Sequence, residues 1–291
     1  MNRRNFLKGS MAAATVPLSF VSTPLLSTAA PGPGDPKVAV LLVDTERVMA
    51  NIDPHIYGQF LEHINHSVED GLFAEQIRGA GFEGDDFRTY WEPFAEAGQV
   101  EIAAIPFQNG GKSVRLTLQG GRAGIRQGRI YIDAGRTYDG FLFVKREEGA
   151  PELTLRVQTA QGALIASVAL PAPESAWRKV PFSFTSSLRD TEAAIEIVAS
   201  GAGALLLDFI SLMRADVRRD GMLRPDLLQS LQGLSPAFIR WPGGSFASTY
   251  KWKEGIGPYP GRGYHPNTFW GGYSDYFGFG TEEFLGLCRK L

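Results

Sequence analysis

The feature that most constrains this 291-residue chain is a stretch of about 100 residues, from 112 to 213, built of strand patterns with no helical pattern between them. In each pattern apolar and polar residues alternate, and Gly, Pro, Asp or Ser residues typical of turns bound it. Eight such strands predict an inserted β-sandwich, and we expect its jelly-roll form. They cover residues 113–119, 129–134, 141–146, 152–159, 164–170, 179–185, 193–199 and 205–213.

The segments on either side of this stretch have a mixed α/β pattern. In residues 37–111 we expect apolar strands over 38–43 and 56–61 and a short helix over 72–77. In residues 214–291, Pro225 suits the first position of a helix, and residues 237–241 form a short apolar strand. A loop rich in Gly and aromatic residues follows, from 242 to 280. The fold class is therefore α/β plus all-β.

A last helix is expected from Thr281, a suitable N-cap, with acidic residues on its first turn and basic residues on its last. Its apolar face consists of Phe284, Leu285, Leu287, Cys288 and Leu291. The chain ends inside this helix on an apolar residue. We interpret Leu291 as a truncation point.

The N-terminus has the pattern of an export signal. Arg3 and Arg4 precede a weakly apolar stretch over 9–21, and small residues at 27–29 suit a signal peptidase. We predict a twin-arginine signal peptide over 1–29, a Pro- and Gly-rich linker over 30–36, and a periplasmic or extracellular protein without a membrane segment in its mature form. A basic tail or an uncleaved anchor are the alternatives. The formal net charge of −2 provides no basic field for nucleic acid, and the single cysteine, Cys288, excludes an internal disulfide.

Two charged residues lie at the carboxyl ends of apolar strands, Glu62 and Arg240. Burial of either charge alone is costly, so each needs a partner or a polar ligand. In a parallel β/α barrel this end of the strands forms the active-site face. A carboxylate and a guanidinium there suit sugar hydroxyls, one accepting and the other donating hydrogen bonds. A plain Glu62–Arg240 ion pair between two strands explains the pattern equally well.

Two groups of motifs resemble a known family. Residues 56–66 (IYGQFLEHINH), 71–75 (GLFAE) and 81–83 (GFE) resemble the opening of glycoside hydrolase family 51, the α-L-arabinofuranosidases, and residues 238–246 (FIRWPGGSF) resemble its second-strand motif. The resemblance covers about 38–98 and 216–291. It implies an incomplete (β/α)8 TIM barrel, represented by its first two strands in 37–111 and 214–291 and interrupted over 112–213 by a carbohydrate-binding-module-like sandwich.

The resemblance also implies roles for particular residues. Glu62 matches the family's glutamate that hydrogen-bonds the arabinofuranose hydroxyls, and Arg240 matches the arginine that supports the sugar subsite. Ser245 stands where many members have an asparagine that touches the sugar, and serine lacks the paired donor and acceptor of that amide. Trp270 lies near an aromatic residue that packs on the sugar face, although simple loop packing explains it equally well.

The family's two catalytic glutamates match nothing in this chain. The acid/base belongs to an Asn-Glu pair, and no Asn-Glu dipeptide occurs in the sequence, so both glutamates are expected beyond Leu291. The resemblance implies retaining hydrolysis of terminal α-L-arabinofuranosyl residues from plant oligo- or polysaccharides, without a cofactor or metal, and an inactive chain as it stands. A homo-oligomer of the full-length protein is left open. The alternatives are another barrel glycosidase of the same clan, such as a xylanase or glucanase, and a non-catalytic protein that binds sugar through the sandwich.

Four further patterns compete with this interpretation. Residues 243–247 approach a nucleophile elbow around Ser245, with His265 as base and Asp275 as third member, but the order of the three residues does not suit that fold. His63 and His66 beside Glu62 lack a third ligand cluster, which argues against a metal. Asp208 is a weak candidate for a structural Ca²⁺ ligand. Aromatic residues of the strands form either a sugar platform or, as we favour, core; they are Tyr131, Tyr138, Trp177 and Phe182.

Overall fold

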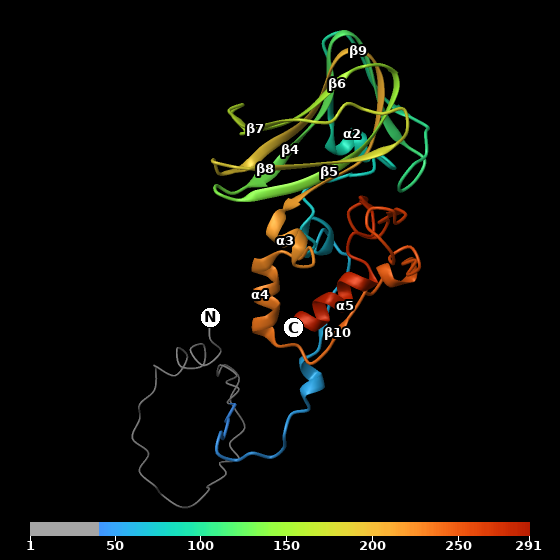
Figure 1. The fold of residues 1–291 in the computed structure, drawn as a ribbon. Helices are drawn as coiled ribbons and strands as arrows, with labels where there is room; N and C mark the ends of the chain where they lie inside the picture. The colour runs from blue at the N-terminus through green and yellow to red at the C-terminus, as the bar shows by residue number, and fades with distance from the viewer. Residues whose placement is uncertain (1–40) are drawn as a thin grey trace, which may run out of the picture. The chain divides into compact units, whose positions relative to one another are not determined.

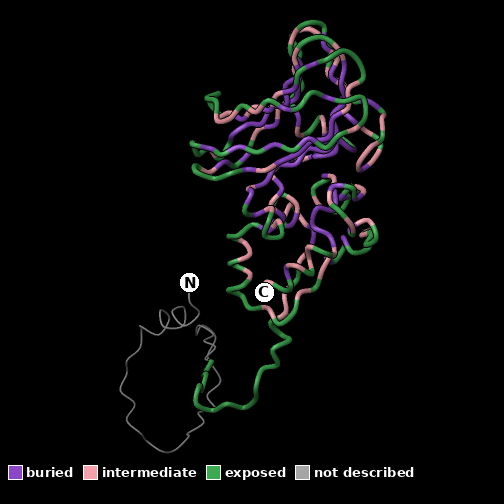
Figure 2. Tube along the Cα trace, in the orientation of Figure 1, coloured by how far each residue is buried: buried purple, intermediate pink, exposed green. Residues whose placement is uncertain are grey.

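The structure is a computed structural model that describes residues 41–291. Residues 52–291 form one compact unit. Residues 41–51, outside that unit, are exposed and have no helix or strand (Figure 2). The signal peptide predicted over 1–29 and the linker over 30–36 lie outside the described residues.

The strand expected over residues 38–43 is wrong in the part that the structure describes. Leu41, Leu42 and Val43 are 86%, 89% and 72% exposed and belong to no strand. An apolar run becomes a strand only where a neighbouring strand satisfies its backbone N–H and C=O groups. No residue of 41–291 pairs with these three.

Eight strands in the middle of the chain form one hydrogen-bonded antiparallel sheet (Figure 1). The shorter strands β2, β3, β7 and β8 lie at its outer positions, and the long strands β4 and β9 run through its centre. The strands are β2 (Glu92–Ala95), β3 (Gly98–Ala103), β4 (Ser113–Ile132), β5 (Thr137–Gly149), β6 (Glu152–Gln158), β7 (Leu164–Ala169), β8 (Arg178–Thr185) and β9 (Asp190–Arg214).

The two long strands β4 and β9 belong to two layers at once. Residues 190–200 of β9 pair with β6 and with the second half of β4, which in turn pairs with β2. Residues 202–214 of β9 pair with β5 and with the first half of β4, which pairs with β3. One layer is completed by β7 and the other by β8. The middle of the chain is therefore a two-layered antiparallel structure, as the strand pattern indicates.

Glycines explain why eight expected strands correspond to six observed ones. Gly120, Gly201 and Gly203 have φ angles of 89°, 102° and 137°, and they bend β4 and β9 without ending them. The sequence pattern predicts turns at these points, because Gly with positive φ is equally suited to a turn and to a kink in a strand. The sheet also begins at Glu92 rather than at residue 112, since β2 and β3 pair with β4.

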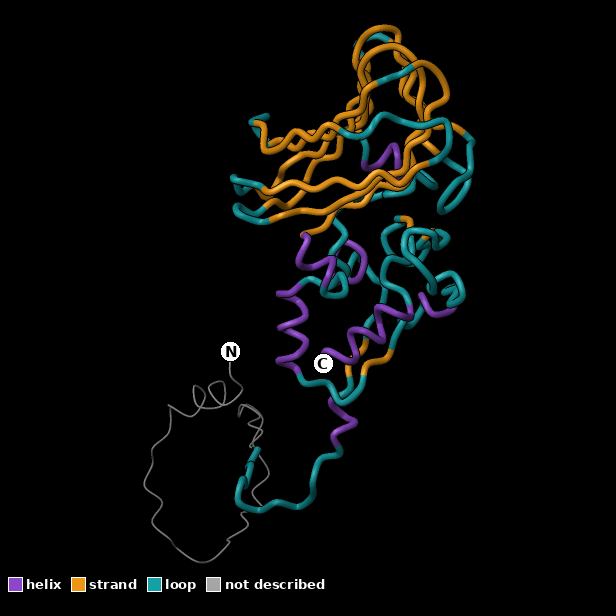
Figure 3. The backbone as a smooth tube through the Cα atoms, viewed as in Figure 1, coloured by secondary structure: helices purple, strands orange, loops and turns teal. Residues whose placement is uncertain are grey.

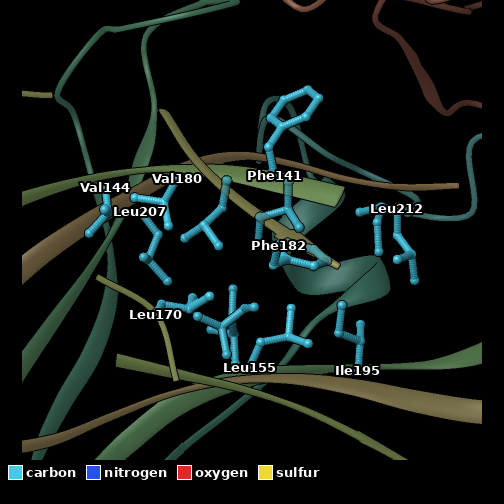
Figure 4. Close-up of a cluster of buried hydrophobic side chains, with 14 of the residues drawn as sticks. Phe141, Val144, Leu155, Leu170, Val180, Phe182, Ile195, Leu207 and Leu212 are labelled. Atoms are coloured by element: carbon cyan, nitrogen blue, oxygen red, sulfur yellow. The ribbon is translucent and has the colours of Figure 1, made fainter. Parts of the chain in front are cut away.

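The core of this region lies between the two layers (Figure 4). Val144, Val180 and Leu207 come from one layer, and Leu155 and Ile195 face them from the other. Leu155, Ile195 and Leu207 are fully buried. Side chains at alternate positions of each strand reach this core, as the twofold period of a strand requires.

The α/β part contains one parallel pair of two-residue strands, β1 (Gln59–Phe60) and β10 (Ile239–Arg240). Hydrogen bonds from the Gln59 amide to the Phe238 carbonyl, 2.8 Å, and from the Leu61 amide to the Arg240 carbonyl, 2.9 Å, flank the pair. The strand expected over 56–61 is shortened because η1 (Pro54–Tyr57) is a 3₁₀ turn, begun by Pro54 and capped by Asp53.

The helices of this part are short (Figure 3). The expected helix over 72–77 is wrong: η2 (Val68–Leu72) is a turn, and Ala74 and Gln76 instead donate backbone hydrogen bonds to the carbonyls of Met222 and Leu212. The helices expected from Pro225 and from Thr281 are confirmed, and three further short helices were not predicted from the sequence. Together they are α2 (Asp86–Tyr90), α3 (Ala215–Arg219), α4 (Pro225–Leu234), η3 (Phe246–Ser248) and α5 (Thr281–Lys290).

Helix α5 differs in detail from the expectation. Its N-cap is Gly280, whose amide donates to the Glu283 carboxylate at 2.9 Å, so Thr281 is already the first helical residue. Of the expected apolar face only Leu287 is fully buried, while Leu285 is 48% exposed and Cys288 is exposed. Between η3 and α5 the chain forms only a small hairpin of β11 (His265–Pro266) and β12 (Ser274–Asp275).

A buried carboxylate joins the layered sheet to the α/β part. Glu75 accepts hydrogen bonds from the Leu212 amide at 2.8 Å and from the Ser211 hydroxyl at 2.5 Å, both on β9. Burial raises the pKa of Glu75, although the charge of Arg218 opposes the shift. No helix within residues 41–291 has the length and apolarity needed to cross a bilayer.

Candidate functional site

The carboxylate of Glu62 is held at the carboxyl end of β1 by donors from distant parts of the chain. Glu62 is 6% exposed. Its Oε1 accepts hydrogen bonds from the Gly244 and Phe246 amides, both at 3.0 Å, and from the Trp270 indole Nε1 at 3.3 Å. Successive amides of a turn form a concave cradle for an anion. The loop after β10 therefore binds the side chain that follows β1.

Gly243 makes room for this arrangement. Its φ of 144° lies in a region that favours glycine, and a Cβ atom at this position would overlap the Cβ and Cγ atoms of Glu62. A larger residue would therefore both strain the turn and displace the carboxylate. The Pro-Gly-Gly sequence after β10 is thus explained by the position of Glu62.

The second oxygen of Glu62 remains open to a ligand. While Oε1 takes three donors, Oε2 accepts no hydrogen bond from residues 41–291, and it is not among the fully buried atoms that lack a partner. A carboxylate oxygen of this kind can accept a hydrogen bond from a hydroxyl group.

Arg240 lies beside this carboxylate in the sheet but does not form the ion pair considered above. The ion pairs of residues 41–291 do not include Arg240, which is exposed. Its guanidinium instead lies 4.3 Å from the ring centroid of Phe60, its partner in register, in a cation–π contact. Its donors are therefore available on the same surface as Phe60.

Beneath Glu62 lies a fully buried histidine–aspartate pair. His63 Nδ1 is 2.5 Å from Asp275 Oδ2, and both side chains have no exposed area. The Trp241 indole donates to His63 Nε2 at 3.3 Å, which assigns the ring proton to Nδ1. The Phe277 amide donates to the other oxygen of Asp275 at 2.7 Å, and Phe246 stacks on the imidazole at 4.6 Å between centroids.

The carboxylate of Glu69 lies close to the His63–Asp275 pair. Ligand atoms of His63, Glu69 and Asp275 all lie within 4.8 Å of one another, a spacing that would allow a metal ion. The donor set argues against one, because Trp241 occupies Nε2 and the Nδ1 proton is directed at Asp275. Burial, with a smaller contribution from the charge of Asp275, holds the pKa of Glu69 well above its usual value. The cluster therefore suits a shared proton better than a cation.

The two remaining predicted residues lie on either side of Glu62. Ser245 is exposed at the start of η3, directly between the two residues whose amides bind the carboxylate. Trp270 is half-buried and fixed at both ends, by its indole on Glu62 and by its amide, which donates to Asn267 Oδ1 at 3.1 Å. The structure thus brings Glu62, Ser245 and Trp270 together, with Arg240 on the adjoining strand.

The competing patterns find less support. Asp275 pairs with His63, and no hydrogen bond links Ser245 to His265 among the described residues, so the elbow triad is not assembled. Both oxygens of Asp208 accept backbone amides, from Gln108 at 3.1 Å and Phe209 at 2.7 Å, and such donors repel a cation. The Ca²⁺ hypothesis therefore fails on its donor set.

The four aromatic residues considered for a sugar platform do not share one surface. Tyr138 is fully buried, Phe182 is 5% exposed and Tyr131 is 41% exposed. Trp177 is half-buried and stacks on Phe107 with centroids 4.3 Å apart. Core packing explains Tyr138, Phe182 and Trp177, and Tyr131 stands apart from them.

Sequence reasoning noted His63 but missed its partners. Asp275 is 212 residues away, and Asn267, whose amide donates to the His63 carbonyl at 2.8 Å, is 204 away. The one signal in the sequence is that both are polar residues inside an aromatic-rich loop. In the structure both are fully buried.

A buried carboxylate with one open oxygen, next to an indole and with an exposed guanidinium on the adjoining strand, suits a hydroxyl-rich ligand such as a carbohydrate. Comparison with known proteins agrees with this class. Residues 230–291 match the family model described as the alpha-L-arabinofuranosidase 1 domain. An extracellular exo-alpha-L-arabinofuranosidase of Streptomyces chartreusis is 30% identical over 323 aligned positions, which include all of this chain and 37% of that protein.

Alpha-L-arabinofuranosidase 1 of Arabidopsis thaliana is 26% identical over 88% of the chain and 42% of its own length. An arabinose-bound family GH51 α-L-arabinofuranosidase structure superposes with a TM-score of 0.69 at 22% identity, over 80% of this chain and 42% of that one, which shows a shared fold. The chain is therefore similar in sequence to named α-L-arabinofuranosidases and in fold to a family GH51 structure, as its two motifs predict. It spans about 40% of the length of these relatives.

Proposed function

We propose that this chain supplies the sugar-binding side of the active site of an α-L-arabinofuranosidase, which releases terminal arabinofuranosyl residues from arabinose-containing oligo- or polysaccharides. The observation that carries the proposal is the asymmetry of Glu62, whose Oε1 is bound by three donors while its Oε2 faces no donor of residues 41–291. A carboxylate fixed in this way can accept a hydroxyl without moving. The relatedness to named arabinofuranosidases supports the identity of the sugar.

Each of the other predicted residues has a role in this proposal. The amides of Gly244 and Phe246 fix Glu62, so that it binds the ring hydroxyls in one orientation. Trp270 covers one side of the subsite while its indole donates to Glu62. Arg240, stacked on Phe60, offers guanidinium donors to the ligand or to neighbouring carboxylates. Ser245 provides a small polar group at the entrance.

The chemistry we propose for the whole protein is retaining hydrolysis. One carboxylate attacks the anomeric carbon and a second protonates the leaving oxygen, then activates the water that releases the sugar. Glu62 and Arg240 orient the furanose ring and take no part in bond breaking. Their contribution to the rate comes from holding the sugar in a reactive position.

The finer architecture belongs to the same proposal. The parallel pair β1–β10 is assigned to the first two strands of a (β/α)8 barrel, and the layered sheet to a jelly-roll-like insert between them. The carboxyl end of this pair carries Glu62, and barrel enzymes place their active sites at that end. The likeness of fold to a family GH51 structure supports the assignment.

We also propose that the protein is exported. The twin-arginine pattern of residues 1–29 supports this route. The related Streptomyces chartreusis protein is named as extracellular, which agrees with it.

The test is hydrolysis of para-nitrophenyl α-L-arabinofuranoside by the whole protein that contains this chain. Glu62→Gln keeps the volume but removes the charge, and we expect a fall in kcat/KM of about 10- to 100-fold, the loss of one or two charge-assisted hydrogen bonds. Glu96→Gln, at an exposed carboxylate on the sheet, is the matched control and should leave the rate unchanged.

Two results would contradict the proposal. Wild-type activity in Glu62→Gln would remove Glu62 from the sugar site. Hydrolysis of the corresponding β-D-xylopyranoside with none of the arabinofuranoside would favour the xylanase alternative.

A further inference from the structure

A second groove lies apart from Glu62, where the layered sheet meets the α/β part. It has a volume of about 670 Å³, within the range of small-molecule sites. Its lining comes from residues 70–78, from 129–133 on β4 and from 214–229 around α4. The polar lining combines basic, acidic and neutral residues, which are Arg78, Arg129, Arg214, Arg224, Asp70, Glu75, Asp133, Asp226, Gln76, Tyr131 and Gln229.

Three of the four arginines in this groove are neutralised by an aspartate close to them in sequence. Arg78 pairs with Asp70 at 2.7 Å. Arg214 pairs with Asp216 at 2.5 Å, and Arg224 with Asp226 at 2.6 Å. In each of these pairs the guanidinium and the carboxylate bind each other.

Arg129 differs from the other three. Its side chain forms no ion pair and no hydrogen bond with residues 41–291, and it is exposed in the groove. The other three arginines show that this groove can satisfy a guanidinium with a nearby acid. Arg129 therefore has donors directed at no group of the described chain.

The backbone at Arg129 supports a role for this side chain. Its φ of 61° is left-handed, and it lies in the β-bulge between Gln127 and Ile130. Such a conformation is unfavourable in a residue with a Cβ, and glycine would adopt it without that strain. Bulges commonly redirect a side chain toward a functional site.

The surroundings of Arg129 suit the neutral part of a sugar. Tyr131 is 41% exposed in the same groove, with Arg189 over its ring at 5.9 Å. The amide of Tyr131 donates to Gln76 Oε1 at 2.8 Å. The side-chain amide of Gln229 lies along the α4 side of the groove. Aromatic faces and amide groups are suited to sugar rings and hydroxyls.

We propose that this groove is a second carbohydrate site, which binds a sugar that carries a carboxylate, with Arg129 as the group that recognises the charge. The planar guanidinium matches a carboxylate through two parallel hydrogen bonds. The choice of a saccharide as the rest of the ligand depends on the proposed function, whereas the need for an anion depends only on the groove. Such a site would favour arabinose-containing chains that also carry acidic sugars over neutral ones.

The experiment is calorimetric titration of chain 1–291 with a short oligogalacturonate and with its methyl ester, which has the same shape without the charge. We expect the acid to bind at least about tenfold more tightly than the ester, the value of a charge-assisted hydrogen bond pair. Arg129→Gly should reduce binding of the acid to the level of the ester. Arg122→Gln, at an arginine on the same strand that pairs with Glu96, is the control and should bind as wild type does.

Thermal unfolding of the same variants separates binding from a structural role. Because glycine relieves the left-handed backbone, Arg129→Gly should melt no lower than wild type. Equal binding of acid and ester, retained binding in Arg129→Gly, or no binding of either saccharide would overturn the proposal. Hydrolysis of the aryl arabinofuranoside, which depends on Glu62, is unaffected by any of these outcomes, so failure of this site and failure of the proposed function remain distinct.

Discussion

The layered sheet and the Glu62 region are stabilised in different ways. The sheet has long registered strands and a continuous apolar core, with side chains such as Leu155 and Ile197 fully buried. The Glu62 region has two strands of two residues each, and Phe60 and Phe238 are both 47% exposed. A smaller apolar cluster that includes Phe73, Phe279 and Leu287 supports this region, and the contacts at the site itself are buried hydrogen bonds, as of Glu62 to a loop and of His63 to Asp275.

This difference teaches which interactions determine each region. The sheet depends on apolar burial, which is non-directional and tolerates exchange of one apolar residue for another of similar volume. The site depends on hydrogen bonds of fixed direction between groups about 200 residues apart. We therefore expect the sheet to respond most to lost volume and the site most to a misplaced donor.

The largest effect on stability should come from the sheet core. Leu155→Ala removes a fully buried side chain and should lower the free energy of unfolding by about 2–5 kcal/mol. Leu285→Ala, the same substitution on α5 at a side chain 48% exposed, should cost less than about 1 kcal/mol. Urea unfolding of the two variants measures both values. Equal losses would mean that α5 is buried as deeply as the sheet.

A smaller effect is expected at the polar centre of the site. Asp275→Asn leaves one acceptor oxygen where two donors, the His63 Nδ1 proton and the Phe277 amide, now find one each, so one of these two hydrogen bonds must be lost. The cost should be about 1–3 kcal/mol, that of one unsatisfied buried group.

Asp216→Asn provides the comparison for this change, because it removes an exposed partner of Arg214 and should cost less than about 1 kcal/mol. Chemical denaturation of both variants compares the buried histidine–aspartate hydrogen bond with the exposed ion pair. A loss in Asp275→Asn no greater than that in Asp216→Asn would show that the buried pair is dispensable.

The third prediction concerns the pH dependence of stability and Asp208, a buried acid on the central strand β9. Burial raises the pKa of Asp208 to about 7 in the folded chain, against an ordinary value of 3.8. The folded chain therefore keeps a proton that the unfolded chain releases, and stability should fall as pH rises from about 4 to about 7, then level off. The slope should approach about 1.4 kcal/mol per pH unit.

Asp208→Asn should remove this contribution to the slope. The free energies of unfolding of the wild type and of Asp208→Asn are measured across pH 4 to 8. Their difference, plotted against pH, gives the contribution of Asp208. A difference curve that is flat, or that rises with pH, would place the folded pKa of Asp208 near or below its ordinary value.

The sequence predicted the sheet better than the site, and the reason is the range of the interactions. Alternation of apolar and polar residues located β5, β6, β7 and β8 to within a few residues. Gly120 and Gly201 misled it, since the same residue serves as turn and as kink. The strand β3 was missed although Val100 and Ile102 alternate with polar residues, because six residues of alternation next to a region with a mixed pattern do not stand out.

At the site, the sequence located individual residues without their relations. Glu62 and Trp270 were proposed from motif and position, but the contact between them needs the course of the loop after β10. Asp275 gives no local signal of its pairing with His63. The expected strand over 56–61 is shortened to β1 because Pro54 begins a 3₁₀ turn before it. The expected helix over 72–77 is wrong because Gln76 bonds to Leu212 of β9 instead.

The most direct test of the central claim, that Glu62 is the fixed carboxylate of a sugar site, is saturation-transfer NMR of methyl α-L-arabinofuranoside with chain 1–291. We predict transfer to the furanose ring protons with the wild-type chain and with Glu96→Gln, and its loss with Glu62→Gln. Undiminished transfer with Glu62→Gln, or none with the wild-type chain, would contradict the account.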